Sequence, residues 1–307
     1  MFSMENAQFV ERARCISCGS DSLMELSSGL FDDKPLHDFI ARDPWGESPL
    51  PYLKGKRWSY VQCRECNQAF HKHILAPDWS ERCCSQWVTQ QAIAAFEKSY
   101  NTPRNLFNKA EQHTKHVLQL EYLTRDLRGE TPVRLLDFGC GYGDFLAVCG
   151  AYGFEAYGID RSCARRENKR YARIFKELEE LKNSEIGAFH VITLFEVLEH
   201  LDNPMFVLEV LCEHLQRGGI LVLETPDCSG VNGIASYDDY RKVHPLDHIN
   251  GFTPATLCGF AERLGFEPVK KPVSHVTCEP KRVIKTEIRR AVSGVMRAST
   301  QQYFRKQ

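Results

Sequence analysis

Hydrophobic positions in the second half of the chain follow two periods, since short apolar runs alternate with amphipathic helical stretches. The last helical stretch shows the second period, because Leu257, Phe260, Ala261 and Leu264 recur at intervals of three and four residues. This alternation predicts an α/β fold with a Rossmann-like, doubly wound and mostly parallel sheet. The expected strands span 133–138, 154–159, 191–195 and 220–224, and the expected helices span 144–152, 161–173, 204–215 and 254–264.

Changes in composition and hydrophobic periodicity divide the chain into four regions. Paired cysteines, several prolines and few periodic runs indicate a small, loop-rich module at the N-terminus. A long helical stretch follows it as a linker, and a basic tail follows the α/β region. An apolar stripe in this tail, from Ile284 to Val295, predicts a helix that packs on the body of the protein. The regions are 1–85 for the module, 86–130 for the helical linker, 131–272 for the α/β domain and 273–307 for the strand or helix tail.

Composition limits the classes of function. The chain has 307 residues, a formal net charge of −1 and 43% hydrophobic residues, which suits a globular protein of about two domains. A net charge near zero argues against a nucleic-acid partner. No apolar run reaches the roughly 20 residues of a membrane-spanning helix. The N-terminus shows no signal peptide, so a cytoplasmic protein without a membrane span is expected.

Four of the 13 cysteines form two C-x-x-C pairs. The pairs are Cys15 with Cys18 and Cys63 with Cys66, and each is followed by a residue that tolerates left-handed backbone, Gly or Asn. Four thiolates complete a closed tetrahedral site, so the pattern predicts a structural zinc ion. The 44 residues between the pairs exceed the usual ribbon spacing and are interpreted as an insertion. Four reduced core cysteines are the alternative.

A glycine-rich loop, Asp137-Phe138-Gly139-Cys140-Gly141-Tyr142-Gly143, lies between an expected strand and an expected helix. Glycines allow a tight turn and let a ligand approach the backbone, and the following helix N-terminus offers N–H groups. Asp160 ends the next strand, 17 residues after Gly143, near the spacing of about 20 expected for a carboxylate that binds ribose hydroxyls. The loop therefore predicts a nucleotide cofactor.

Charge separates the two cofactor classes that fit this loop. A dinucleotide fingerprint has its third glycine where Asp144 stands. Asp137 and Asp144 would repel a pyrophosphate, whereas a zwitterion with an ammonium and a sulfonium would tolerate them. The sequence therefore favours S-adenosylmethionine over NAD, and a nicotinamide dehydrogenase becomes the weaker alternative.

Three further motifs accompany the loop: 191–201 (VITLFEVLEHL), 218–226 (GGILVLETP) and 248–254 (HINGFTP). Together with residues 135–146 they resemble class I S-adenosylmethionine-dependent methyltransferases, in particular the small-molecule family that includes the ubiquinone-type O-methyltransferases. The likeness covers about 130–268. It implies that Asp137, Gly139, Cys140 and Gly141 hold the amino acid end of the cofactor. Asp160 would hold the ribose, Arg161 would lie beside the adenine, and Phe195 and Glu196 would line the other side.

A hydroxyl acceptor must lose its proton during methyl transfer, and a histidine suits this task. His248 is the first candidate for the general base and His244 the second, because both follow the fifth strand, where loops form the crevice of such sheets. A supporting role in the loop is the alternative for either residue. Glu199 and His200 are expected to hold the turn after the fourth strand; with Asp247 as a third ligand they would instead bind a metal.

The acceptor follows from resemblance alone. A zinc module before a methyltransferase domain resembles both sugar methyltransferases of deoxysugar and surface-polysaccharide pathways and some ribosomal RNA base methyltransferases. The net charge of −1 argues against RNA. The leading hypothesis is therefore O-methylation of a small molecule, such as a sugar, a nucleotide-linked sugar or another secondary metabolite. An RNA base methyltransferase and a non-catalytic cofactor-binding module are the alternatives.

Overall fold

The computed structural model describes residues 6–127, 132–171, 173–184, 186–276, 280, 281, 283, 284, 288 and 300–307. They form two compact units. Unit 1 contains the described residues up to Asn101, together with Leu198–Phe206 and Pro226–Gly259. Unit 2 contains Thr102–Val197, Val207–Thr225 and the described residues from Phe260 onward. Two segments that the sequence pattern placed in the α/β region thus belong to the compact unit of the N-terminal module.

Unit 2 is built on a seven-stranded sheet, counted over the described residues, with the order β12-β13-β10-β9-β6-β7-β8. The five strands from β10 to β8 are parallel, and β13 and β12 run antiparallel to them. The prediction of a doubly wound, mostly parallel sheet is confirmed. The strands are β6 (Arg134–Phe138), β7 (Glu155–Ile159), β8 (Ile174–Phe175), β9 (Phe189–Phe195), β10 (Leu215–Glu224), β12 (Phe266–Val269) and β13 (Gln302–Lys306).

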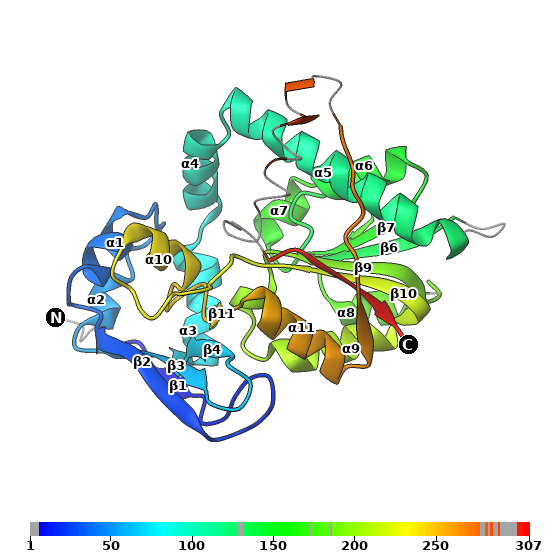
Figure 1. Ribbon diagram of the computed structural model, residues 1–307. Coiled ribbons are helices and arrows are strands. Elements are labelled where there is room, and N and C mark those ends of the chain that lie inside the picture. Colours follow the sequence, from blue (N-terminus) through cyan, green and yellow to red (C-terminus); the bar gives the residue numbers. More distant parts are fainter. Residues whose placement is uncertain are drawn as a thin grey trace. The chain divides into compact units, whose positions relative to one another are not determined.

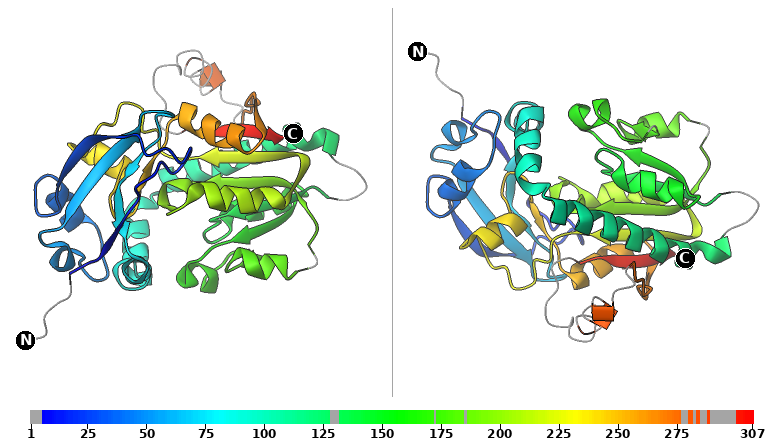
Figure 2. Two further views of the ribbon diagram at one scale, coloured as in Figure 1. Left: turned by 90° about the horizontal axis from the view of Figure 1, so that it is seen from below. Right: turned by 90° about the horizontal axis from the view of Figure 1, so that it is seen from above.

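Helices cover both faces of this sheet, as α5 and α6 on one side and α9 and α11 on the other show in Figures 1 and 2. Strands buried on both faces read as continuous apolar runs, and Val191, Ile220 and Val222 are fully buried in the core between the layers. No helix within the described ranges is both long and apolar enough to cross a membrane. The helices that lie wholly or partly in unit 2 are α5 (Pro103–Thr124), α6 (Asp144–Ala151), α7 (Cys163–Glu167), α8 (Leu178–Lys182), α9 (Pro204–Glu213) and α11 (Pro254–Arg263), with the short 3-10 turn η2 (Arg125–Leu127). A second 3-10 turn, η3 (Leu198–His200), belongs to unit 1.

Two expected helices differ from the structure. The stretch 86–128 is divided among a π-helix η1 (Cys83–Trp87), α4 (Gln90–Tyr100) and α5. The break before α5 has a local cause, because the Thr102 hydroxyl caps the new helix and Pro103 occupies its first turn. The helix expected over 161–173 is reduced to α7, because the chain must leave it to supply strand β8 from Ile174.

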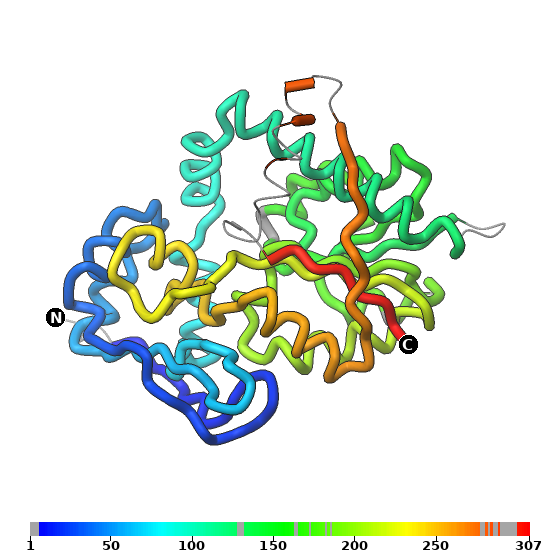
Figure 3. The backbone as a smooth tube through the Cα atoms, viewed as in Figure 1, coloured from blue at the N-terminus to red at the C-terminus, as the bar shows by residue number. Residues whose placement is uncertain are grey.

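The end of the chain completes the sheet of unit 2. Strand β13 pairs antiparallel with both β10 and β12, and Tyr303 and Phe304 are buried in it. Figure 3 shows this last segment, in red, running along the strand from 215 to 224. The helix expected along the stripe from Ile284 to Val295 falls mostly outside the described residues.

Unit 1 contains a four-stranded antiparallel sheet of order β11-β4-β3-β2 and a short β1-β5 ladder, within the described residues. Its core combines N-terminal side chains such as Phe39 and Tyr60 with Tyr240, Val243 and Leu246 from the later segment, drawn in yellow in Figure 3. Its elements are β1 (Phe9–Glu11), β2 (Leu23–Leu30), α1 (Leu36–Arg42), α2 (Leu50–Leu53), β3 (Arg57–Cys63), β4 (Ala69–His71), β5 (His73–Leu75), α3 (Pro77–Arg82), α10 (Tyr237–Lys242) and β11 (Asn250–Gly251).

Candidate functional site

The glycine loop of unit 2 joins β6 to α6 and adopts a conformation that only glycine takes easily. Gly139 and Gly141 have φ angles of 82° and 59°. A Cβ on Gly139 would lie 2.4 Å from Cγ2 of Val197, whereas a Cβ on Gly141 would meet nothing within 4 Å. The first glycine is thus required by close packing. The second faces open space, where a ligand can approach the backbone.

Asp160 closes this loop from the end of β7. One carboxylate oxygen accepts a hydrogen bond from the Gly141 N–H at 2.8 Å, and the other accepts one from the Ser162 N–H at 2.9 Å. The side chain is buried. A carboxylate has about four lone-pair sites, so Asp160 keeps capacity to accept two further hydroxyl donors. This geometry fits the hydroxyls of a ribose at the predicted position.

Asp137 lies at the other side of the loop, in β6, and is buried. The Thr193 hydroxyl donates to it at 2.6 Å from the neighbouring strand β9. Burial raises the pKa of Asp137 to about 7, an effect that the Thr193 hydrogen bond opposes and the nearby Asp160 charge reinforces. A bound cationic group would favour the ionised carboxylate. Asp137 is thus an acid whose charge state depends on the ligand beside it.

The charge argument drawn from the sequence needs a correction at Asp144. Its carboxylate forms ion pairs with Lys109 at 2.9 Å and with Arg170 at 2.8 Å, and these cations lower its pKa against the opposing effect of burial. The charge of Asp144 is therefore compensated within unit 2, and Asp137 is partly protonated near neutral pH. Repulsion of a pyrophosphate by these two acids is weaker than their positions in the sequence suggest.

The raised pKa of Asp137 predicts a pH-dependent stability. In the unfolded chain the carboxyl group of Asp137 loses its proton near its ordinary pKa of 3.8, but in the folded chain it keeps the proton until about pH 7. The folded state therefore binds more protons across that window, and this residue's contribution to the free energy of unfolding falls as pH rises. Asp137→Asn removes the effect. The variant should gain about 2–3 kcal/mol over the unmodified protein between pH 5 and pH 8, in ligand-free urea denaturation. A stability difference that does not change with pH would contradict the raised pKa.

Phe195 and Glu196 lie at the carboxyl end of β9, as the motif predicts. The Phe195 ring stacks on the ring of His116 with centroids 4.8 Å apart. Glu196 adopts a φ of 55°, a conformation that costs a non-glycine residue about 1–3 kcal/mol and marks functional sites. Its N–H donates to the Glu224 carbonyl at 2.8 Å, which joins the ends of β9 and β10.

The sequence analysis did not predict three polar side chains of this region: Gln112, His116 and Glu224. His116 and Gln112 of α5 approach the Glu224 carboxylate, at 3.8 Å and 3.4 Å respectively. His116 and Glu224 are both buried, and burial lowers the pKa of His116 to about 3. The sequence feature that could have indicated these residues is the presence of polar side chains on the inner face of the amphipathic helix α5. They place a neutral imidazole and a carboxylate at the carboxyl edge of the sheet, where such folds bind ligands.

The other two residues assigned to the cofactor differ in setting. Cys140 is buried within the glycine loop, and its Sγ lies 2.4 Å from where a Cβ on Gly158 would stand. Its thiol therefore packs against β7, and burial raises its pKa above the usual range. Arg161 lies two residues after the end of β7 and is exposed. Cys140 thus contributes its backbone to the loop, and Arg161 stays a predicted neighbour of the adenine.

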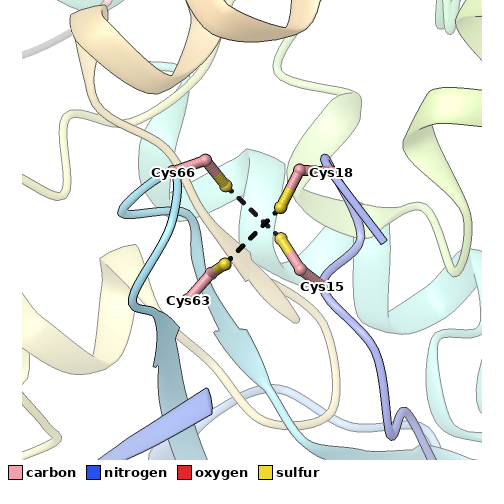
Figure 4. A group of neighbouring side chains, drawn as sticks. All are labelled: Cys15, Cys18, Cys63 and Cys66. Carbon is pink, nitrogen blue, oxygen red and sulfur yellow. Dashed lines mark hydrogen bonds between the residues drawn. The ribbon is translucent and has the colours of Figure 1, made fainter. Parts of the chain in front are cut away.

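The four paired cysteines converge in unit 1, as Figure 4 shows. Their sulfur atoms all lie within 4.8 Å of one another, with Cys15 to Cys66 at 3.5 Å and Cys18 to Cys63 at 3.6 Å. Gly19 and Asn67, after the two pairs, have φ angles of 75° and 61°, as their residue types predict.

The long spacing between the cysteine pairs also has a structural cause. The insertion forms the antiparallel strands β2 and β3, and Leu23 pairs with Cys63. The antiparallel pairing brings the second cysteine pair next to the first. The insertion therefore helps to build the cysteine site.

The two candidate bases lie in unit 1 and differ in their hydrogen bonding. Both ring nitrogens of His244 are engaged: Nδ1 accepts from the Leu246 N–H at 3.0 Å, and Nε2 contacts the Tyr240 hydroxyl, which in turn contacts Asp43. His248 keeps 21% of its side chain exposed, although its Nδ1 atom is buried. Burial lowers the pKa of His248 to about 4.

Glu199 and His200 occupy the turn after β9, as expected. His200 Nδ1 lies 2.9 Å from an Asp247 carboxylate oxygen. Burial disfavours the imidazolium, but Asp247 outweighs it and raises the pKa of His200 to about 9. Ligand atoms of Glu199, His200 and His248 lie within 4.8 Å of one another, whereas Asp247 is paired with His200. The ion pair ties the turn to the loop that carries His248.

A glycine loop after the first parallel strand, with a carboxylate at the end of the next, defines a nucleotide-cofactor enzyme of the Rossmann-like class. A family model described as a methyltransferase domain matches residues 104–271, which is over half of the chain. The chain therefore belongs to this family, and the protein is a class I S-adenosylmethionine-dependent methyltransferase.

Individual relatives are more distant. The ubiquinone biosynthesis O-methyltransferase of Shewanella pealeana is 29% identical over 193 residues, covering 57% of this chain and 81% of that protein. The ubiquinone biosynthesis O-methyltransferase of Alkalilimnicola ehrlichii is 30% identical over 122 residues, which cover 37% of this chain and 49% of that protein. The match therefore spans about half of that protein. The crystal structure of a SAM dependent methyltransferase from Archaeoglobus fulgidus is 20% identical with a TM-score of 0.45, covering 70% of this chain and 99% of that one.

Proposed function

We propose that this methyltransferase acts on an oxygen atom of a small molecule, such as a sugar, a nucleotide-linked sugar or another secondary or surface-polysaccharide metabolite. The names of the two relatives, both O-methyltransferases of ubiquinone biosynthesis, favour a small acceptor and oxygen. A net charge of −1 argues against an RNA acceptor.

In this proposal the described residues of unit 2 hold S-adenosylmethionine. Asp160 accepts the ribose hydroxyls with its remaining lone pairs, Gly139 allows the loop to pack tightly on Val197, and Gly141 lets the cofactor approach the backbone. Asp137 becomes ionised beside the ammonium group, because an opposite charge favours its carboxylate. Bound S-adenosylmethionine supplies an electrophilic methyl group on a sulfonium. The protein itself contributes position and a water-poor environment.

His248 is the general base of this proposal. Its lowered pKa of about 4 keeps the imidazole neutral at physiological pH, and 21% of its side chain remains exposed. The protonated His200, whose ring lies edge-on with its centroid 4.7 Å away, helps to keep His248 neutral. In this proposal His248 would accept the proton of the acceptor hydroxyl, whose oxygen would receive the methyl group that bound S-adenosylmethionine supplies.

His248→Ala should lower turnover by about 100-fold or more, the usual range for loss of a general base, with unchanged affinity for S-adenosylhomocysteine. The measurement is formation of S-adenosylhomocysteine, followed by mass spectrometry over a panel of nucleoside diphosphate sugars, free sugars, phenols and RNA. His37→Ala, at a half-exposed histidine of unit 1, is the matched control and should keep full turnover. Undiminished turnover in His248→Ala would eliminate this base, and methylation of RNA alone would eliminate the small-molecule acceptor.

We further propose that the four cysteines bind one structural zinc ion. A tetrahedral site with zinc–sulfur bonds of about 2.3 Å places its sulfurs about 3.8 Å apart. The Sγ–Sγ separations of 3.5 Å and 3.6 Å are close to this value and far longer than the S–S bond of a disulfide, about 2.05 Å. Four thiolates leave no open position, so the ion would serve the fold of unit 1 and take no part in the chemistry.

A further inference from the structure

A single arginine of unit 1 connects three segments that lie far apart in the sequence. Arg12 follows β1 directly and stands three positions before the first cysteine of the cluster. Its Nε and Nη2 atoms donate to the His71 carbonyl at the end of β4, at 3.0 Å and 2.6 Å. Nη2 also donates to the Ile249 carbonyl at 2.9 Å, and Nη1 donates to the side-chain oxygen of Asn250 at 2.7 Å. The elements β1, β4 and β11, which these contacts join, are labelled in Figure 1.

The guanidinium of Arg12 uses all of its hydrogen-bonding capacity within unit 1. Arg has five N–H donors in a fixed planar fork. The fifth contact is the longest, since Nη1 lies 3.5 Å from the Asp202 carbonyl. Every acceptor is an uncharged oxygen, so the contacts fix geometry without forming an ion pair. A lysine, with one ammonium group on a flexible stem, cannot reproduce this fork.

Asn250 extends this network to the turn after β9. The side chain is fully buried, and its amide nitrogen donates to the carbonyls of Leu198 and Leu201 at 2.9 Å and 2.7 Å. These two carbonyls stand on either side of His200 in the sequence. Arg12 can only donate, so the amide oxygen of Asn250 must face it while the amide nitrogen faces the turn. The amide is therefore held in one orientation, between the arginine and the turn.

The same contacts fix the loop that carries His248. Ile249 follows His248 directly, and its carbonyl is held by Arg12. Asp247 precedes His248, and its carboxylate lies 2.9 Å from Nδ1 of His200. The rings of His200 and His248 meet edge-on, with centroids 4.7 Å apart. The position of the His248 ring thus depends on how firmly the backbone after it is tied to the turn.

We infer that Arg12 is a positioning residue for the proposed general base, because it fixes the loop of His248 to the turn of His200. A displacement of about 1 Å can cost a reaction about 100-fold in rate, so a rigid support for the base matters. The inference rests on the role proposed for His248. It gives the N-terminal module a part in catalysis, since Arg12 lies between β1 and the cysteine cluster.

The pKa of His200 reports on this geometry and needs no acceptor. Burial opposes the positive charge of His200, but the Asp247 carboxylate and, to a smaller extent, Glu199 raise its pKa to about 9. Arg12→Gln should loosen the loop and lower this pKa to below about 8, because a nearby opposite charge changes a pKa by about 1–3. Loss of a positive charge by itself would raise the pKa of His200. The direction of the change therefore separates lost position from lost charge.

NMR of the full, zinc-loaded chain with isotope-labelled histidines gives this pKa, and a His200→Gln sample assigns the signal. Arg12→Lys keeps the charge but loses the fork, so it should lower the pKa of His200 by a smaller amount, and it replaces Arg12→Gln if that variant does not fold. The matched control is Arg14→Gln, at an exposed arginine two positions away that donates to the Gly19 carbonyl at 3.3 Å. The control should keep the pKa of His200 at about 9.

Zinc content and affinity for S-adenosylhomocysteine should be the same in all of these proteins, which shows that both units are folded. A pKa of His200 that stays at about 9 or rises in the folded Arg12 variants overturns the positioning role. With the acceptor found for the unmodified protein, turnover of Arg12→Gln should fall about tenfold or more, and full turnover would also overturn the role. Undiminished turnover in His248→Ala would instead remove the base, while a lowered pKa of His200 would still show that Arg12 fixes the loop.

Discussion

Replacement of Cys63 by serine is expected to release zinc and to lower the melting temperature by more than about 10 °C. Structural zinc contributes about 10–16 kcal/mol in small zinc-binding peptides, and a loss of a few kcal/mol shifts the midpoint of a domain of this size by about 2–4 °C per kcal/mol. Cys63 is fully buried, at the end of β3, in a small core cluster with Val61 and Phe70. Loss of the ion should therefore unfold unit 1 from this end.

Metal analysis by mass spectrometry and thermal unfolding followed by circular dichroism measure this result. The unmodified protein should hold about one zinc ion per chain, and a strong chelator should reproduce the behaviour of Cys63→Ser. Cys84→Ser changes an exposed cysteine of the same unit outside the cluster, so it should keep its zinc and its melting temperature. Zinc-free purified protein with an unchanged melting temperature in Cys63→Ser would refute the proposed site.

Asp160→Ala is expected to weaken binding of S-adenosylhomocysteine at least tenfold, which is about 1.4 kcal/mol or more. The variant loses the proposed acceptor of the ribose hydroxyls. It also leaves the N–H groups of Gly141 and Ser162 without their carboxylate, so the loop loses the contact that closes it. Hydrogen bonds to a charged group contribute about 1.5–3 kcal/mol each, which makes the tenfold figure a lower bound.

The matched control is Asp144→Ala, because Asp144 is another carboxylate beside the glycine loop and its charge is already compensated. Its oxygens are taken up by Lys109 and Arg170, so its removal should change the affinity by less than about threefold. Asp160→Asn should fall between the two, since the amide keeps one acceptor oxygen. Equal affinity of Asp160→Ala and the unmodified protein in calorimetry would remove the ribose assignment. An equal loss in Asp144→Ala would show that the effect is general electrostatics.

Much of unit 2 could be predicted from the sequence, because its main features depend on the chemistry of neighbouring residues. A glycine loop depends on backbone freedom at Gly139 and Gly141, and a terminal carboxylate such as Asp160 depends on its place at the end of a strand. Both properties belong to a short stretch of chain, so the strand–loop–helix pattern predicted the sheet that the structure shows. The cysteine pairs are similar, since the left-handed residues Gly19 and Asn67 follow each pair directly.

Long-range packing decided the remaining features. The charge on Asp144 looked unopposed in the sequence, but Lys109 and Arg170, 35 and 26 positions away, compensate it. His116 became a candidate site residue because α5 places it against Glu224, 108 positions further along the chain. Pairs at such separations leave no periodic trace, and for this reason sequence reasoning missed them.

The sequence by itself therefore determined the class of protein, the glycine loop, the acid at Asp160 and the two cysteine pairs, because each depends on neighbouring residues. The tertiary structure decided that β13 completes the sheet of unit 2 and that residues 226–259 pack with the N-terminal module. It also distinguished His248, which keeps 21% of its side chain exposed, from His244, whose two ring nitrogens are both engaged and whose side chain is 8% exposed. The physical reason is the same in each case: burial and hydrogen bonding depend on which distant segments meet.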